Sequence, residues 1–189
     1  MFLLAQPRAT KEAGDSWRPL FEFVSWLEQA NDTPLHPSVY KKLLRRISKT
    51  PDACRSVLEM MNNASRTTPT RETYEQVVCA FLESNRKSEA VEVLLEGSAR
   101  LGGDQMVSCA KAILSEYLKY GTTWKKQQSA LDATEKILLQ VRNSDVHLLA
   151  MKIYAQHASV DHVVALFQDL QSDATLGTFP MHYRVLLFA

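Results

Sequence analysis

Residues suited to a metal or redox site are scarce in this chain of 189 residues. There are three cysteines, Cys54, Cys79 and Cys109, and no C-x-x-C pair. An odd number of separate cysteines beside apolar helical positions predicts reduced, core-like thiols and a protein from inside the cell. The five histidines lack the paired spacing with cysteine that zinc sites usually show, so we expect no metal site.

Glycine is also rare, and long apolar runs are absent. The six glycines form no phosphate-binding loop, and none flanks a serine or cysteine in the manner of a strained nucleophile. We therefore expect no enzyme, no catalytic residue and no cofactor. No apolar run approaches the roughly 18 residues that a bilayer-spanning helix needs, so we expect no membrane partner.

Neither sign of charge is in large excess. Lysine and arginine number 22 against 21 acidic residues, which gives a formal net charge of +1. This balance argues against nucleic-acid binding that is driven by bulk charge, but it allows a local basic stripe.

The chain does have helical periodicity, with apolar residues at Tyr74, Val77, Val78 and Phe81 on one helix face. After a polar break, a second stripe begins at Ala90. The same alternation recurs, in stripes that start at Tyr40, Cys54, Met106, Ala130, Val146, Val160 and Tyr183. No segment shows sustained strand alternation, so we predict an all-α fold. Each helix hairpin leaves apolar surface on both sides, and it is stable only when similar hairpins stack against it.

Turn residues suggest where the helices begin and end. Prolines precede three hairpins, and Gly102 with Asp104 predicts a C-terminal glycine followed by an N-cap. An amphipathic helix over residues 17–30, with Leu20, Phe23, Val24 and Leu27 on one face, is expected to cap the stack. We divide the chain into a flexible N-terminus or presequence remnant (1–14), a capping helix (15–33), and about four hairpins plus the first helix of a fifth (34–189).

Residues 69–102 resemble a pentatricopeptide repeat. Pro69-Thr70 precedes Thr73-Tyr74, a polar turn follows at Ser84-Asn85, and Ala90 stands sixteen residues after the tyrosine. Residues 146–170 are similar, although His147 stands where the tyrosine would be. The tetratricopeptide repeat is the competing resemblance, but its usual tryptophan and glycine are missing from the matching positions.

This resemblance implies a right-handed superhelical α-solenoid of helix-turn-helix hairpins. It also implies an organellar protein that binds RNA or belongs to an RNA–protein assembly. The family's base-reading position, two residues after the tyrosine, holds Lys42, Gln76 and Leu149. Because leucine cannot hydrogen-bond a base edge and none of the three is a small amide or hydroxyl residue, we expect low sequence specificity.

A basic stripe is the candidate RNA contact, and its residues are Lys41, Lys42, Arg45, Arg46 and Lys49. These cations share one helix side, and phosphates would relieve their mutual repulsion. The alternative is an ordinary solvated helix face. Lys125 and Lys126, in a predicted inserted loop, form a weaker second patch or a flexible surface turn.

The last apolar stripe, Tyr183, Leu186 and Leu187, is half of a hairpin. We expect either further chain or a protein partner to cover it. The prediction from sequence is a non-catalytic repeat protein of the mitochondrial matrix that binds RNA, protein or both. It would serve a ribonucleoprotein complex such as the mitochondrial ribosome or an RNA-processing or editing assembly. A tetratricopeptide-like adaptor with no RNA contact is the alternative.

Overall fold

The structure, a computed structural model, describes residues 17–30, 35–63, 68–119, 124–173 and 176–188. These ranges contain ten α-helices, one short 3-10 helix and no strand. The predicted all-α fold is confirmed for this part of the chain. The possible presequence in residues 1–14 lies outside the described residues.

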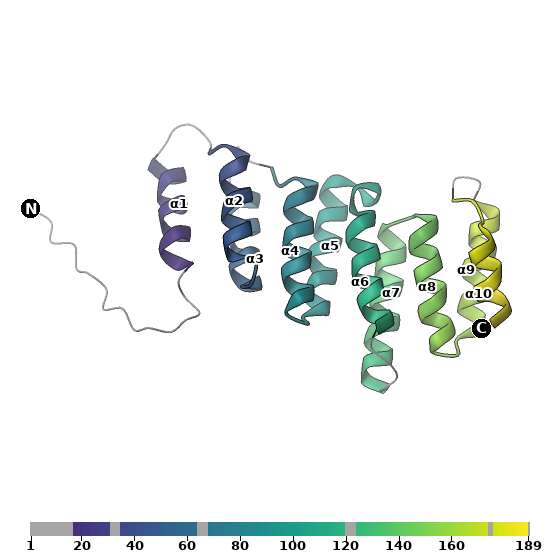
Figure 1. Ribbon diagram of the computed structural model, residues 1–189. Helices are drawn as coiled ribbons and strands as arrows, with labels where there is room; N and C mark the ends of the chain where they lie inside the picture. Colours follow the sequence, from purple (N-terminus) through teal and green to yellow (C-terminus); the bar gives the residue numbers. More distant parts are fainter. Residues whose placement is uncertain (1–16, 31–34, 64–67, 120–123, 174–175, 189) are drawn as a thin grey trace, which may run out of the picture.

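The helices follow one another in a row from α1 to α10 (Figure 1). Their bounds are α1 Arg18–Ala30, α2 Pro37–Ile47, α3 Pro51–Asn63, α4 Arg71–Glu83, α5 Lys87–Leu101, the 3-10 helix η1 Gly103–Met106, α6 Val107–Lys119, α7 Trp124–Gln140, α8 Ser144–Gln156, α9 Val160–Ser172 and α10 Pro180–Phe188.

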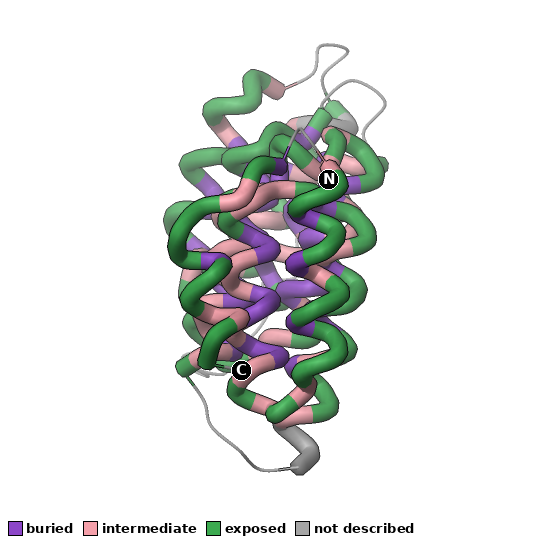
Figure 2. The backbone as a smooth tube through the Cα atoms, turned by 90° about the vertical axis from the view of Figure 1, so that its right-hand side faces the viewer, coloured by how far each residue is buried: buried purple, intermediate pink, exposed green. Residues whose placement is uncertain are grey.

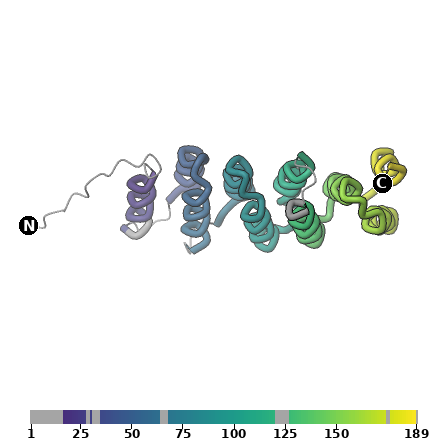
Figure 3. Tube along the Cα trace, turned by 90° about the horizontal axis from the view of Figure 1, so that it is seen from below, coloured from purple at the N-terminus to yellow at the C-terminus, as the bar shows by residue number. Residues whose placement is uncertain are grey.

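From α2 onward the helices form two layers (Figure 3). We call α2, α4, α6, α8 and α10 the first helices and α3, α5, α7 and α9 the second helices. Each first helix contacts the next first helix, and α3, α5, α7 and α9 each contact the first helix that follows. Contacts therefore run between neighbours along the row.

The core lies between the layers, where the predicted stripes are buried (Figure 2). Tyr40 and Tyr74, which open the stripes of α2 and α4, are fully buried. A second cluster joins α8, α9 and α10 through Met151, Phe167 and Leu170. The apolar periodicity thus correctly identified the inward face of these helices.

The first helices begin at residues 37, 71, 107, 144 and 180, at intervals of 34 to 37 residues. Side chains bond across this interval. Arg86 Nη1 lies 2.6 Å from Asp52 Oδ1, and Lys111 Nζ lies 2.6 Å from Asp145 Oδ2. Each of these pairs is separated by 34 residues, so polar contacts link successive hairpins at the same register.

Two predicted local features are wrong. Asp104 does not cap α6, because it lies inside η1 and α6 begins at Val107. Gly102 does follow α5, with φ +91°, a conformation that favours glycine. The backbone of Lys125 and Lys126 belongs to the first turn of α7 rather than to a loop. Their side chains lie outside the described residues.

Some predicted core positions are also wrong, and one is Val160, which opens the predicted stripe of α9 and is 47% exposed. Cys79 is exposed, whereas Cys54 and Cys109 are buried as expected. In α1, Val24 is buried, but Leu20 and Phe23 are largely exposed. The stripe of α1 is apolar as predicted, but among the described residues only part of it is buried.

Candidate functional site

The basic stripe lies on α2 and in the turn that follows it. Pro37 occupies the first turn of the helix, and His36 Nδ1 accepts a hydrogen bond from the Ser38 backbone N–H at 3.3 Å. With Tyr40, Leu43, Leu44 and Ile47 buried, all five predicted cations are exposed. These five exposed cations are Lys41, Lys42, Arg45, Arg46 and Lys49.

The four cations of α2 divide between two flanks, because successive residues turn by about 100° around a helix. Lys41 and Arg45 lie beside Leu44 and line the groove between α2 and α4. Lys42 and Arg46, on the other flank, and Lys49, in the turn after α2, do not line that groove. The structure therefore does not present the five as one uniform surface.

The groove between α2 and α4 is acidic on its far side. Its volume is about 410 Å³, and α4 contributes Glu72, Glu75 and Glu83 to its lining. The pKa of Glu72 is lowered, mainly by the hydrogen bond from Thr70, with the charge of Lys41 adding to the effect. Lys41 and Arg45 thus face carboxylates of the same molecule.

The sequence around α2 does not reveal these carboxylates, because they lie on α4, about 30 residues further along the chain. The repeat register contained the signal, since Glu75 follows Lys41 by 34 residues and so occupies the matching place on the next first helix.

No ion pair forms at any of the five cations within the described ranges. Arginines of α3 and α4 behave differently. Arg55 lies 2.9 Å from Glu96, and Arg71 lies 2.8 Å from Glu75. The flank formed by Lys42, Arg46 and Lys49 is consequently an exposed cationic surface with no described carboxylate within ion-pair distance.

The three base-reading positions expected from the family resemblance are placed differently. Lys42 is exposed. Gln76 lines the groove between α2 and α4, and its Oε1 is buried with no hydrogen-bond partner among the described residues. Leu149 is half-buried and packs against the core. They do not make a uniform row of polar side chains along the first helices.

The thiols lack the character of nucleophiles. Burial raises the pKa of Cys54 and of Cys109 to about 12. Partial burial, followed by the charges of Glu83 and Glu75, raises the pKa of Cys79 as well, so its thiolate is disfavoured. Within the described residues, no group of three potential ligands could hold a metal ion. None of the described helices is long and apolar enough to cross a bilayer.

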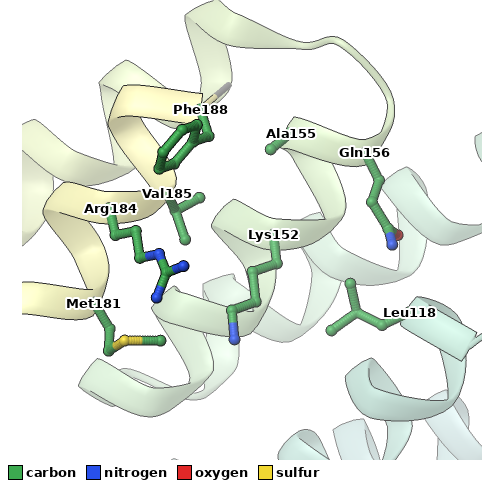
Figure 4. Close-up of a pocket in the computed structure, with 8 residues that line it drawn as sticks. All are labelled: Leu118, Lys152, Ala155, Gln156, Met181, Arg184, Val185 and Phe188. Atoms are coloured by element: carbon green, nitrogen blue, oxygen red, sulfur yellow. The ribbon is translucent and has the colours of Figure 1, made fainter.

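A second groove lies near the C-terminal end of the row, between α6, α8 and α10 (Figure 4). It has a volume of about 590 Å³, and its floor is mainly apolar. Lys152 of α8 and Arg184 of α10 lie on facing sides of it. This groove combines apolar surface with positive charge.

The predicted docking residues lie on α10. Tyr183 and Leu187 are exposed, and the Tyr183 ring meets the Phe167 ring edge-on at a centroid distance of 4.9 Å. Leu186 is half-buried and packs against the second cluster. It therefore holds α10 against α8 and α9 and is not part of the exposed surface of α10. The structure therefore brings Tyr183 and Leu187, but not Leu186, to the outside.

Comparison of this chain with models of protein families, with curated proteins and with solved structures gave no match in any of the three. The pentatricopeptide resemblance stays a prediction that depends on the residues quoted above. The described residues thus carry two candidate surfaces. One is the exposed basic flank near the N-terminal end of the row, and the other is the apolar groove with two cations near the C-terminal end.

Proposed function

We propose that this chain is a non-catalytic, pentatricopeptide-like repeat protein of a mitochondrial ribonucleoprotein complex, such as the mitochondrial ribosome or an RNA-processing or editing assembly. Its hairpins would form a right-handed superhelical solenoid in the matrix. Two observations support this proposal: helices that recur at intervals of 34 to 37 residues, and the repeat-like residues from Pro69 to Gly102.

The observation that carries the RNA part is the exposed flank of Lys42, Arg46 and Lys49, which lies outside the groove that the α4 carboxylates line. Cations that face carboxylates across a groove gain less from a phosphate, which those carboxylates repel, whereas cations away from carboxylates gain attraction and release counterions from the nucleic acid. Phosphate contacts carry no base identity, which agrees with the irregular base-reading positions. The proposed mode is contact with single-stranded RNA at low sequence specificity.

A salt titration tests this. Fluorescence anisotropy with labelled oligouridylate should show affinity that falls with salt, because each neutralised phosphate of a single strand contributes about −0.7 to the log–log slope. Replacing Lys42, Arg46 and Lys49 together by glutamate should abolish binding.

Two variants make that test specific. Replacing Lys41 and Arg45 by glutamate should weaken binding less, because these side chains face Glu72 and Glu75. Replacing Arg100 and Lys136, exposed cations on second helices, should change little. An equal loss of oligouridylate affinity in all three variants would contradict a defined RNA interface on α2.

The second candidate function is a protein adaptor without RNA contact. It is favoured by the carboxylates of α4, which face Lys41 and Arg45 across the groove and would repel a phosphate backbone there. Absence of oligouridylate binding at low salt would favour this reading. In both candidates the exposed Tyr183 and Leu187 of α10 form a protein-docking surface.

A further inference from the structure

Helix α10 is a first helix whose inner side is open. Its start lies 36 residues after that of α8, so Tyr183 corresponds to His147 and Leu187 to Met151. In α8 these positions are 2% and 0% exposed, because they face the second helix α9. In α10 they are 47% and 80% exposed. Among the described residues, no second helix covers these two side chains of α10.

Helix α1 has the stripe of a second helix. Its apolar residues Leu20, Phe23, Val24 and Leu27 precede the buried stripe of α3 by 34 residues. That stripe is Cys54, Val57, Leu58 and Met61. Leu20 is 41% and Phe23 is 54% exposed, whereas Cys54 and Val57 are buried. Helix α1 therefore carries the residues of a second helix, and within the described ranges one of its flanks is exposed.

The open flank of α1 is the one that would face a first helix. In α3, the Cys54 thiol donates a hydrogen bond to the Ile47 carbonyl of α2 at 3.4 Å, within its own hairpin. On the other flank, Arg55 pairs with Glu96 of the following hairpin. The matching residues of α1 are the exposed Leu20 and the half-buried Phe21, which packs against the core. The open side of α1 is thus the side by which α3 contacts α2.

We infer that copies of this chain associate head to tail, with α10 of one copy packing against α1 of the next. The two helices together would make one complete hairpin, with α10 as its first helix and α1 as its second. This inference deepens the proposed docking role of α10, on which it rests, by naming the partner as a second copy. It does not depend on RNA binding.

The shape of the molecule makes the contact intermolecular. Helices α1 and α10 lie at opposite ends of the row, so they do not pair within one copy (Figure 1). The contact is heterologous, because it uses different surfaces on its two sides. Each added copy leaves both kinds of end available, so the assembly grows unless it closes into a ring.

Sedimentation velocity over a range of protein concentrations tests the inference. The wild-type weight-average mass should rise with concentration above the 21.4 kDa of one chain. Leu187→Glu and Phe23→Glu each place a charge on one end, and each should lower the association constant by about tenfold or more. Leu139→Glu, at an α7 leucine that is 75% exposed, is the matched control and should associate like wild type.

Mixing the two variants distinguishes head-to-tail contact from symmetric contact. Phe23→Glu keeps an intact α10 and Leu187→Glu keeps an intact α1, so an equimolar mixture should form dimers of twice 21.4 kDa and stop there. Far-ultraviolet circular dichroism of each variant should match wild type, because the replaced side chains are exposed.

Three outcomes overturn the inference. They are a wild-type protein that is monomeric at all concentrations, a variant mixture that stays monomeric, and an association that only one of the two variants weakens. The oligouridylate titration on the monomeric variants provides a separate readout. A protein that binds RNA but does not self-associate would refute the head-to-tail contact and leave the RNA proposal standing.

Discussion

The middle of the row and its two ends carry the same apolar pattern but bury it very differently. Val93 and Leu94 of α5 are enclosed by neighbouring helices. Phe23 near one end and Leu187 near the other occupy equally apolar helix faces that are open to solvent. In a stack of hairpins, periodicity defines which side of a helix is apolar, and the presence of a neighbour decides whether that side is buried.

Truncating a leucine in the middle should have the largest effect on this comparison. Leu94→Ala removes a fully buried side chain and should lower the free energy of unfolding by about 2–5 kcal/mol. Leu187→Ala at the end should change it by less than about 0.5 kcal/mol. Urea unfolding at a low protein concentration measures both. Similar losses at both positions would show that α10 is buried in solution.

Adding a methyl group at Gly103 should cause the next largest loss in the free energy of unfolding. A Cβ there would lie 2.0 Å from the Gln140 carbonyl oxygen, so η1 or the end of α7 must move. We expect Gly103→Ala to cost about 1–3 kcal/mol.

Gly177, towards the C-terminal end, is the contrasting position. A Cβ there meets nothing within 4 Å, so the cost of Gly177→Ala should come only from its φ of +65° and be about 1 kcal/mol. Thermal unfolding compares the two alanine variants. A larger loss at Gly177 would refute the close approach at Gly103.

Two equivalent turns offer a stabilising change. Asn85 between α4 and α5 and Ala158 between α8 and α9 both adopt positive φ, at 58° and 53°. Asparagine tolerates this conformation better than alanine. Ala158→Gly should therefore raise the free energy of unfolding by about 0.5–1 kcal/mol, and Asn85→Gly should change it less. Equal effects at the two turns would argue against strain at Ala158.

The smallest expected effect concerns how the free energy of unfolding depends on pH, because the α8–α9 hairpin has a buried histidine where the α4–α5 hairpin has a tyrosine. His147 occupies the place that the tyrosine Tyr74 holds in α4, and burial lowers its pKa. Its folded pKa is below its unfolded value of about 6.5, so its stabilising contribution is present above that pH and is lost as the pH falls.

Urea midpoints measured on both sides of that pH test this. His147→Gln, which cannot titrate, should reduce the loss of stability on acidification. An unchanged pH response would show that His147 does not titrate as expected.

The sequence was sufficient to predict helices, their order and most of their buried faces, because the i, i+3, i+4 spacing of residues such as Tyr40, Leu43 and Leu44 is local. It did not predict the exposure of Leu20 and Phe23, since that depends on whether another helix is present. The position of Asp104 in a 3-10 helix was missed because the chain turns there to bring Gly103 against α7.

The candidate site was only partly predictable for the same reason. The five cations of α2 were identified as exposed positions from one segment. Their division into a flank that faces Glu75 and a flank without carboxylates depends on how α2 packs against α4, which no single helix reveals.

Hydrogen exchange along the chain tests most directly whether stability depends on neighbouring helices. It should be measured on Leu187→Glu at a low concentration, so that self-association does not protect the ends. We predict the slowest amide exchange in α4, α5 and α6 and progressively faster exchange towards α1 and α10. Protection of α1 and α10 that equals that of α5 would mean that the chain unfolds as one unit, and it would contradict this account.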